Sequence, residues 1–327
     1  MSKSNVLDFS SGLADDIKAM VDFRKSMGVT DYEYLLSKFD RFCVSNYPDR
    51  KTLEREMVLN WIADERSQHN RIRNNAVAIR QLGKYIVSEG KHAYVLPNDF
   101  VSSRTNFVPY IFTDEDLTRF FQTTDSLKYH KSNPNSHIIA PVLFRLLYCC
   151  GLRPNEGREL KSKNVNLENG EILIEHNKQK NQRFVVMSDD LLLMCQKYET
   201  QRNIFAPKSE FFFPGYNNQP YSTQRVTAMF KQCWRKCNLK NGIENYQNAR
   251  PYDLRHRFAS AVLHKWITEG KDLYVMLPYL RAYMGHKYFS STAYYIHILP
   301  ENIKAVANID WQKFETLIPE VRLYEND

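Results

Sequence analysis

The chain has 327 residues, of which 43% are hydrophobic and 25% charged, and a formal net charge of +8 at pH 7. This composition excludes a disordered chain, and the length exceeds the roughly 100–200 residues of a typical domain, so we expect two domains with hydrophobic cores. The positive charge permits a polyanionic partner, but many ordinary domains are equally basic, so charge alone does not predict nucleic-acid binding.

No segment predicts membrane insertion or secretion. The longest apolar run, IIAPVLFRLLYCCGL (138–152), is interrupted by Pro141 and Arg145 and is too short to cross a bilayer. The amino terminus, MSKSNVLDFSSGLADDIKAM, lacks the continuous apolar core and small-residue cleavage site of a signal peptide. We therefore expect a cytoplasmic protein without a membrane partner. The six cysteines form no CxxC pair, which favours buried thiols in a reducing compartment over a zinc site.

Residues 12–93 predict one helix after another, with polar breaks between them and no alternating strand pattern. Within RIRNNAVAIRQLGKYIV (71–87), helical spacing predicts a packed stripe and a separate basic face. The packed stripe comprises Ile72, Ala76, Ile79, Gly83 and Ile86, and the basic face comprises Arg73, Arg80 and Lys84. A solvated helix surface is the alternative interpretation of the basic face, and it weakens only if the rest of the chain handles DNA.

A linker and a second domain follow. Residues 96–112 contain two prolines and little periodicity, and Thr113 with Asp116 then predicts a capping box that opens a new helix. In ENGEILIEHNKQKNQRFVVM (168–187), two short β-prone runs flank a lysine-rich tip and predict a hairpin. Further helices are expected at 189–201, 222–236, 253–268 and 278–284.

Three short motifs place polar side chains at helix ends. In GLRPNE (151–156), Pro154 suits the first helical position, which puts Arg153 just outside a helix N-terminus, where anions bind. In RPYDLRHRF (250–258), Asp253 is a candidate N-cap with Arg255 in the first turn. In MGHKYF (284–289), Gly285 is expected to end a helix and to present His286 just beyond it.

Each motif alone has an ordinary structural explanation, because arginines at helix ends often bind carboxylates and a histidine after a glycine is often only a surface residue. Together, two arginines, a lysine-tipped hairpin, a histidine and a tyrosine supply donors for one phosphodiester and a nucleophile to attack it.

In this combination the chain resembles the tyrosine recombinases, the integrase-like site-specific DNA recombinases. The resemblance rests on GLRPNE, NKQKNQR (177–183), YDLRHRFAS (252–260) and MGHKYFSSTAYYIH (284–297), about half of the chain. The family pattern is Arg, Lys, His-x-x-Arg, Gly-His and a tyrosine nine positions later. Counted from His286, that tyrosine is Tyr295, and Tyr294 becomes a packing neighbour. The resemblance implies these catalytic residues: Arg153, Lys178, Tyr252, Arg255, His286 and Tyr295, with Lys180 as a competing lysine or a DNA contact.

One position departs from the family pattern, because Tyr252 stands where the first histidine is expected. A phenol has a reference pKa near 10 and is a poor general base at neutral pH, so the route by which Tyr295 loses its proton stays open. His256, directly after Arg255, is interpreted as structural.

The resemblance also implies architecture and partners. We expect a mainly α fold with a small β-sheet, arranged as a two-domain C-shaped DNA clamp. It would comprise a helical core DNA-binding domain (1–95), a linker (96–112) and an α+β catalytic domain (113–327). The tail of the catalytic domain, from about 301, would dock on a neighbouring subunit or pack on its own domain. The partners would be double-stranded DNA with recombination sites, contacted by Arg73, Arg80 and Lys84 of the basic face, and further copies of the chain, as a tetramer on two sites, with accessory proteins possible. No cofactor or metal is expected, and the location implied is a bacterial cytoplasm or nucleoid.

The expected reaction is recombination through a 3′-phosphotyrosyl intermediate, in the integration or excision of a mobile element. A type IB topoisomerase, which uses similar chemistry to relax DNA, and a noncatalytic DNA-binding protein on a recombinase scaffold are the alternatives. Covalent capture of DNA and the formation of recombinant product distinguish the three.

Overall fold

The computed structural model describes residues 8–29, 32–64, 69–100, 109–175 and 182–297. The chain divides into two compact units, Met1–Val108 and Pro109–Asp327. The predicted C-shaped clamp concerns how two such units are arranged, and it stays a prediction, as do the functions assigned to the predicted domains. The predicted docking tail, from about residue 301, lies outside the described residues.

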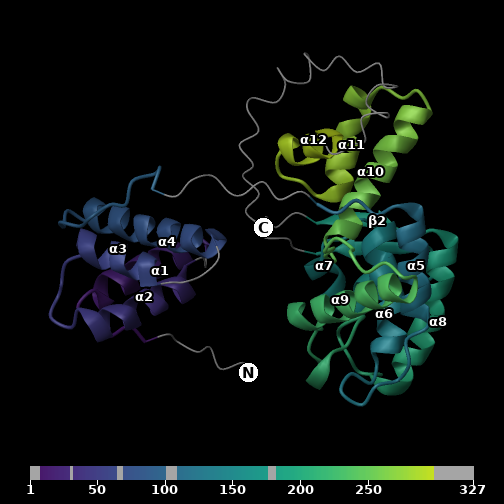
Figure 1. Cartoon of the computed structure of the whole chain (residues 1–327), viewed down its shortest axis with the longest axis horizontal. Coiled ribbons are helices and arrows are strands. Elements are labelled where there is room, and N and C mark those ends of the chain that lie inside the picture. The colour runs from purple at the N-terminus through teal and green to yellow at the C-terminus, as the bar shows by residue number, and fades with distance from the viewer. Residues whose placement is uncertain (1–7, 30–31, 65–68, 101–108, 176–181, 298–327) are drawn as a thin grey trace. The chain divides into compact units, whose positions relative to one another are not determined.

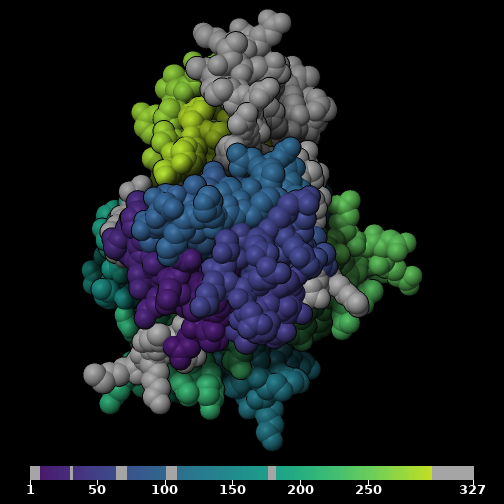
Figure 2. Space-filling model, turned by 90° about the vertical axis from the view of Figure 1, so that its left-hand side faces the viewer, coloured from purple at the N-terminus to yellow at the C-terminus, as the bar shows by residue number. Residues whose placement is uncertain are grey.

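The first unit is helical in its described part (Figure 1). Its helices pack around one apolar core in which Phe39 meets Trp61 edge to face, with ring centroids 5.0 Å apart. The purple side chains of the first helix and the blue side chains of the fourth adjoin on the face shown in Figure 2. The helices are α1 (Ala14–Ser26), α2 (Glu33–Asn46), α3 (Arg55–Asp64) and α4 (His69–Ser88).

Helix α4 confirms the predicted packed stripe, because Ala76, Ile79 and Ile86 are all buried in the core of the first unit. The predicted basic face needs a correction at Arg80. This side chain is buried, and its Nε and Nη2 donate to the carbonyls of Leu96 and Pro97 at 2.8 and 2.5 Å. Arg80 therefore holds the chain that follows α4, and little of its side chain is exposed on the basic face of the helix.

The second unit contains the remaining helices and one small sheet. Helices α5, α6, α8 and α9 form its larger part, and α10 to α12 gather at one end of it (Figure 1). The helices are α5 (Asp114–Asp125), α6 (Ser136–Cys149), α7 (Pro154–Arg158), α8 (Asp189–Phe205), α9 (Thr223–Lys240), α10 (Asp253–Thr268), α11 (Leu273–Met284) and α12 (Phe289–His297), with 3₁₀ turns at Ser162–Asn164 and Tyr216–Asn218.

The sheet is the predicted hairpin. Strands β1 (Glu171–Ile174) and β2 (Arg183–Val186) pair antiparallel, with Glu171 opposite Val186 and Ile174 opposite Arg183. Ile172, Ile174 and Val185 point into the core, whereas Phe184 and Val186 are exposed. The alternation puts Val185 on the buried face of β2. Arg183 begins the strand on the same face, because it lies two residues before Val185. The hairpin tip, 176–181, lies outside the described residues.

Two separate apolar cores support the second unit. The larger core joins α5, α6, α8 and α9 to the sheet, with Phe120, Phe144 and Phe230 packed against one another at its centre. The smaller core is formed by α10, α11 and α12, and it includes Tyr295. The polar site described below lies where these two cores meet, because α10 contacts both α6 and α12.

The sequence predicted N-terminal caps for α5 and for α10, with different outcomes. The capping box of α5 is confirmed, because Thr113 Oγ1 accepts from the Asp116 amide at 3.1 Å and Asp116 Oδ2 accepts from the Thr113 amide at 3.0 Å. The N-cap predicted at Asp253 is wrong by one residue: Tyr252 takes that position, and Asp253 instead accepts from the Arg250 amide at 2.8 Å.

The six thiols are free, and five of them are buried as predicted, but Cys149 is exposed. Within the described ranges, no helix is long and apolar enough to cross a bilayer. Nor do those ranges bring three or more His, Cys, Asp or Glu side chains close enough together to hold a metal ion.

Candidate active site

The site begins at the turn between α6 and α7, where Gly151 has φ +59°. A Cβ at Gly151 would lie 2.5 Å from the ring of Phe258, so only glycine fits both the backbone and the contact. Two residues later Arg153 occupies the N-cap of α7, with Pro154 at the first helical position as predicted. The guanidinium of Arg153 donates to Glu156 Oε1 at 3.0 Å and to the Gly285 carbonyl at 3.3 Å.

Arg255 lies in the first turn of α10 and is completely buried. Its Nη1 donates to the Gly151 carbonyl at 2.7 Å, and its Nη2 donates to the Met284 carbonyl at 2.7 Å. The same Nη2 lies 2.9 Å from His286 Nε2. The Nε–H of Arg255 is buried and has no acceptor in the described part of the chain. A buried donor without an acceptor is costly, so a ligand oxygen there would be favoured.

His286 follows the left-handed Gly285 that ends α11, as predicted. A guanidinium has no acceptor, so His286 Nε2 accepts from Arg255, and the ring proton must be on Nδ1, which donates to Thr292 Oγ1 at 2.8 Å. The imidazole is therefore neutral in this arrangement. Burial, followed by the charges of Arg255, Arg153 and Arg183, lowers the pKa of His286 to about 2.

Tyr295 lies on α12, and its ring stacks on His286 with centroids 5.8 Å apart and an interplanar angle of 17°. Tyr295 is 2% exposed, whereas Tyr294 is half-buried. The ring of the predicted nucleophile thus lies against the predicted histidine, but it is buried in the smaller core of the second unit.

Tyr252 adjoins the cluster through the ring of His256. The His256 ring lies 5.0 Å from the ring of Tyr252 and 5.5 Å from that of Tyr295, measured between centroids. Burial, followed by the charges of Arg250 and Arg255, lowers the pKa of His256 to about 3, so this ring is also neutral at pH 7. His256 therefore packs between the two tyrosines.

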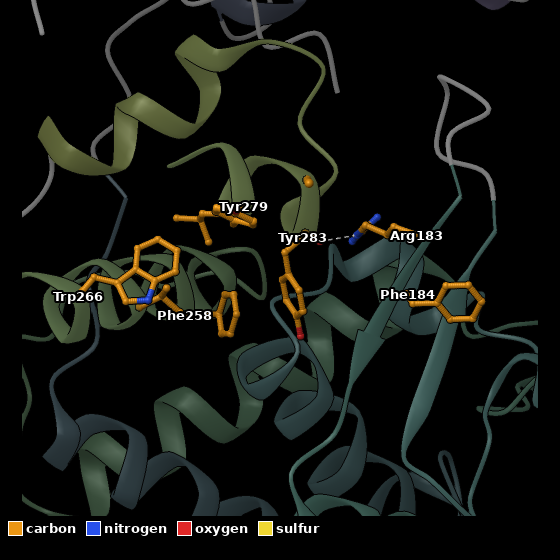
Figure 3. Close-up of a pocket in the computed structure, with 9 residues that line it drawn as sticks. Arg183, Phe184, Phe258, Trp266, Tyr279 and Tyr283 are labelled. Atoms are coloured by element: carbon orange, nitrogen blue, oxygen red, sulfur yellow. Dashed lines mark hydrogen bonds between the residues drawn. The ribbon is translucent and has the colours of Figure 1, made fainter. Parts of the chain in front are cut away.

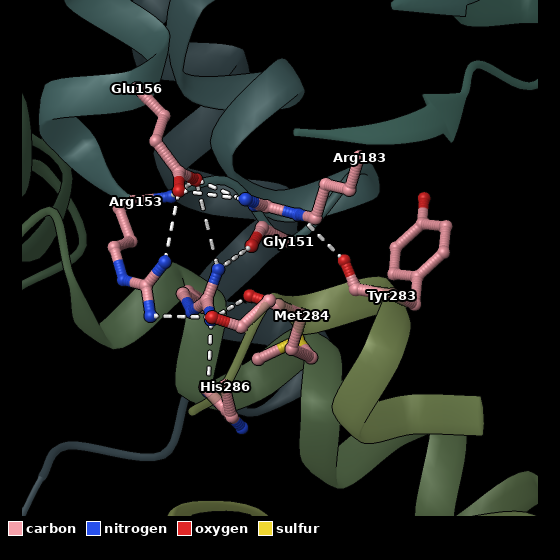
Figure 4. Close-up of polar contacts among 9 residues, drawn as sticks. Gly151, Arg153, Glu156, Arg183, Tyr283, Met284 and His286 are labelled. Atoms are coloured by element: carbon pink, nitrogen blue, oxygen red, sulfur yellow. Dashed lines mark hydrogen bonds and ion pairs between the residues drawn. The ribbon is translucent and has the colours of Figure 1, made fainter. Parts of the chain in front are cut away.

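Two further members of the site were not singled out by the sequence reasoning. Arg183 Nη1 and Nη2 form a bidentate pair with Glu156 Oε1 and Oε2 at 2.9 and 2.7 Å, and Arg183 Nε donates to the Tyr283 carbonyl at 2.8 Å (Figure 4). Both residues lie inside quoted motifs, at the end of GLRPNE and of NKQKNQR. Glu156 could have been found as the third residue of a helix preceded by Arg153, since its carboxylate accepts from the Arg153 amide at 2.8 Å.

The cluster carries more positive than negative charge. Burial alone would raise the pKa of Glu156, but the hydrogen bonds and charge of Arg183 and the charges of Arg255 and Arg153 outweigh it and lower that pKa to about 2. One ionised carboxylate therefore faces three guanidinium groups, with closest N–O separations of 3.0 Å to Arg153, 2.7 Å to Arg183 and 3.9 Å to Arg255. With both histidines neutral, the excess positive charge favours an anion in this place.

The other predicted residues belong to the first unit or fall outside the described residues. Lys178 and Lys180 fall in 176–181, outside the described residues. Arg73, Arg80 and Lys84 belong to the first unit, where Lys84 is exposed, Arg73 is half-buried and Arg80 is buried.

A neighbouring apolar pocket of about 590 Å³ adjoins Arg183 (Figure 3). Its walls include Phe258, Trp266, Tyr279 and Tyr283, together with the side chain of Arg183. Arg183 thus has the charged cluster on one side and apolar walls on the other.

Residues 111–302 match the model of the phage integrase family. The chain is 24% identical over 295 residues to a putative integrase/recombinase, y4rE, of Sinorhizobium fredii, covering 88% of this chain and 92% of that protein. It is 30% identical over 170 residues to the tyrosine recombinase XerD of Staphylococcus aureus, covering 51% of this chain and 52% of that protein.

Two solved structures have a similar fold. The site-specific recombinase XerH, bound to its difH substrate after cleavage, superposes with a TM-score of 0.62 and 18% identity, over 90% of this chain and 83% of that one. The Tn1549 transposon integrase in complex with transposon right-end DNA gives a TM-score of 0.62 and 16% identity, over 92% and 99%.

Proposed function

The chain belongs to the phage integrase family and is a tyrosine recombinase, and on that premise we propose that it cuts and rejoins DNA at specific sites through a bond between Tyr295 and a DNA phosphate. One observation carries the proposal: three guanidinium groups surround a single carboxylate beside His286, and the ring of Tyr295 stacks on that histidine. An excess of buried cations next to a phenol suits attack on a phosphodiester.

The proposed reaction has two steps that are the reverse of each other. The Tyr295 oxygen attacks the scissile phosphorus, the bond from phosphorus to the 5′ oxygen breaks, and a 3′-phosphotyrosyl link forms. The 5′ hydroxyl of a partner strand then attacks that link, releases Tyr295 and reseals the backbone. The covalent intermediate conserves the energy of the broken bond, so no nucleotide cofactor is required.

Arg153 and Arg255 would hold the nonbridging oxygens as negative charge builds in the transition state. The excess of positive charge around the single carboxylate near Arg255 supports its assignment. His286 was expected to neutralise charge as well, but it is neutral in the DNA-free chain. A bound phosphate adds negative charge beside His286, which would raise its pKa and allow it to donate.

The proposed cleavage needs two proton transfers, one to the leaving 5′ oxygen and one from the phenol of Tyr295. Lys178, or Lys180, would protonate the leaving 5′ oxygen, as the resemblance implies. The phenol proton of Tyr295 must pass to a base or to water, and Tyr252 is an unsuitable base for the reason already given. Because Tyr295 is 2% exposed, helix α12 has to shift before the phenol can reach a phosphate.

The proposed partner is double-stranded DNA carrying recombination sites. XerH and the Tn1549 integrase were solved as complexes with DNA, which supports this partner for a chain of similar fold. We extend the proposal to a tetramer acting on two sites, to a role in the integration or excision of a mobile element, and to a bacterial cytoplasmic location. The similarity to a transposon integrase is the reason for choosing a mobile element.

In the first unit, Lys84 and Arg73 remain the proposed DNA contacts on α4. Lys84 is exposed, Arg73 is half-buried, and neither has an ion pair described for it. Exposed lysines and arginines bind phosphates along a duplex without reading its sequence, so their contribution would be to affinity and not to specificity.

The test is covalent capture of DNA. The Tyr295→Phe variant is first used to select binding sequences from a pool of random duplexes. The selected sequence is then rebuilt with a nick beside the candidate cleavage position and incubated with wild type, Tyr295→Phe and Tyr294→Phe. Tyr294 is the matched control because it is adjacent on α12 and its ring also contacts His256, with centroids 6.4 Å apart.

We expect an SDS-resistant adduct with wild type and Tyr294→Phe and none with Tyr295→Phe. Adduct loss with Tyr294→Phe alone would move the nucleophile by one residue. An adduct without recombinant product on paired sites would indicate topoisomerase activity. Binding of the selected DNA without any adduct would indicate a noncatalytic protein and would end the proposal.

A further inference from the structure

Arg183 is the cation of the site that binds Glu156 through both of its terminal nitrogens. It is the first residue of β2, and its side chain is 8% exposed. Both of its terminal nitrogens bind Glu156, and its Nε binds the carbonyl of Tyr283 near the end of α11 (Figure 4). Arg183 thereby joins β2, α7 and α11 through three hydrogen bonds.

The carboxylate that Arg183 holds also serves Arg153. Glu156 accepts from both the amide and the Nη1 of Arg153, and it lies 3.9 Å from Arg255 Nη1. A bidentate pair fixes the plane of a carboxylate, because two parallel hydrogen bonds permit little rotation. If Arg183 released Glu156, the carboxylate would turn toward Arg153 and Arg255 and compete with a phosphate for them.

A second contact connects Arg183 to the turn before His286. A Cβ at Gly285 would lie 2.9 Å from Arg183 Nη1, so the guanidinium rests directly on this glycine. The carbonyl of the same glycine accepts from Arg153 Nη2 at 3.3 Å. Arg183 therefore contacts the turn that sets the position of His286 as well as the carboxylate that sets the position of Arg153.

Apolar packing holds Arg183 only in part, because one side of it borders the pocket of about 590 Å³ (Figure 3). Its position depends on the charge and shape of the guanidinium. A lysine would keep the charge but could not form the fork on Glu156 together with the bond to Tyr283.

We propose that Arg183 is a positioning residue for DNA cleavage, which keeps the carboxylate of Glu156 from forming further bonds to Arg153 and Arg255 and fixes the turn before His286. This inference rests on the proposed function, because it needs a cleavage reaction to act on. It adds a residue that acts through Glu156 and does not itself touch the phosphate.

The experiment compares the rate constant of adduct formation among variants of the full chain on the selected nicked duplex. The variants are Arg183→Met, Arg183→Lys, Glu156→Gln and the double variant Arg183→Met/Glu156→Gln. Arg202→Met is the matched control, because Arg202 is a buried arginine that holds Glu199 with two nitrogens and donates to the Ser209 carbonyl, outside the site. Thermal unfolding and DNA affinity are measured for each variant.

Arg183→Met should lower the rate constant on the order of 100-fold, because a small displacement of catalytic groups has effects of this size. Glu156→Gln added to Arg183→Met should restore at least about tenfold of the loss, since the competing charge is then gone. A merely structural arginine would not be rescued in this way. Arg202→Met should lower the melting temperature and leave the rate constant within about threefold of wild type.

Removal of one partner of a buried ion pair can unfold a protein, so Arg183→Lys keeps the test valid if Arg183→Met does not fold. We expect Arg183→Lys to bind the duplex like wild type and to form adduct about tenfold more slowly. The inference is overturned if Arg183→Lys reacts at the wild-type rate, or if the double variant loses the product of the two single losses. Absence of adduct with wild type is a different result, because it removes the proposed function itself.

Discussion

Arg80 in the first unit and Arg255 in the second are both buried arginines that donate to two backbone carbonyls, yet their surroundings differ. Arg80 binds the carbonyls of Leu96 and Pro97, and burial lowers its pKa while the nearby charge of Asp99 opposes that change. Arg255 has two other arginines close to the one carboxylate that it approaches, and its Nε–H has no acceptor among the described residues.

Under the proposed function, the difference separates a structural cation from one that binds phosphate. Around Arg80 the donors are matched by carbonyls, and one arginine lies near one aspartate. Around Arg255 positive charge exceeds negative charge, and a buried donor is left over. Burial of an arginine therefore says little about its role, whereas an excess of buried cations over their anions favours the binding of an anion.

The most severe test of the difference between Arg80 and Arg255 is the substitution Arg255→Lys, which keeps the charge and loses the planar fork. We expect the rate constant of adduct formation to fall on the order of 1,000-fold, because loss of an oriented donor to a transition-state oxyanion has effects of this size. The measurement is single-turnover cleavage of the nicked duplex at saturating protein. If Arg255→Lys cleaves like wild type, Arg255 does not bind the scissile phosphate.

The pH dependence of stability is a second test, because the charged cluster contains two neutral histidines, His256 and His286. The pKa of His286 is about 2 and that of His256 about 3, against 6.5 in the unfolded chain. Between these values the unfolded chain binds more protons than the folded chain, so stability is lost as the pH falls below 6.5. Two such groups predict a loss of about 2 to 3 kcal/mol per pH unit near pH 5.

Glu156 acts in the same direction at lower pH. Its folded pKa of about 2 lies below the unfolded value of 4.5, so its stabilisation is present above pH 4.5 and disappears as the pH falls toward 2. The measurement is urea unfolding of the full chain between pH 4 and 7, followed by hydrogen exchange of peptides from α10 to α12. The control is His256→Gln, which should reduce the slope near pH 5 by about half, and an unchanged slope would contradict the assignment.

The smallest expected effects concern α4. Arg80→Lys should lower the free energy of unfolding of the first unit by about 1 to 3 kcal/mol, because carbonyls bound by Arg80 lose their donors, and should leave DNA affinity unchanged. Lys84→Gln should leave stability unchanged and weaken DNA binding several-fold, with the salt dependence reduced by about one phosphate contact. The measurements are denaturant unfolding and binding titrations at several salt concentrations. If Arg80→Lys weakens binding more than Lys84→Gln, the correction made for Arg80 is itself wrong.

Much of the fold could be predicted because its signals are local. The hairpin follows from two β-prone runs, the capping box from Thr113 and Asp116, and the end of α11 from Gly285. Arg153, Arg255, His286 and Tyr295 could be named because the family pattern fixes their spacing. Their catalytic roles await the experiments proposed above.

What the sequence could not supply are relations between residues far apart in the chain. The pairing of Arg183 with Glu156 spans 27 positions and depends on how β2 packs beside α7. The burial of Arg80 depends on where the chain runs after α4, since helical periodicity says only that Arg80 is off the main apolar stripe. The neutral state of His286 likewise depends on Arg255, which is 31 positions away.

The cations of the site are held by main-chain carbonyls as well as by the side chains of Glu156 and His286. Arg255 binds the carbonyls of Gly151 and Met284, Arg153 binds that of Gly285, and Arg183 binds that of Tyr283. Main-chain atoms persist through most substitutions, so mutations can accumulate around the site without dismantling it. The proposed chemistry would therefore tolerate changes elsewhere around the site, provided that Glu156 and the glycines at 151 and 285 are retained.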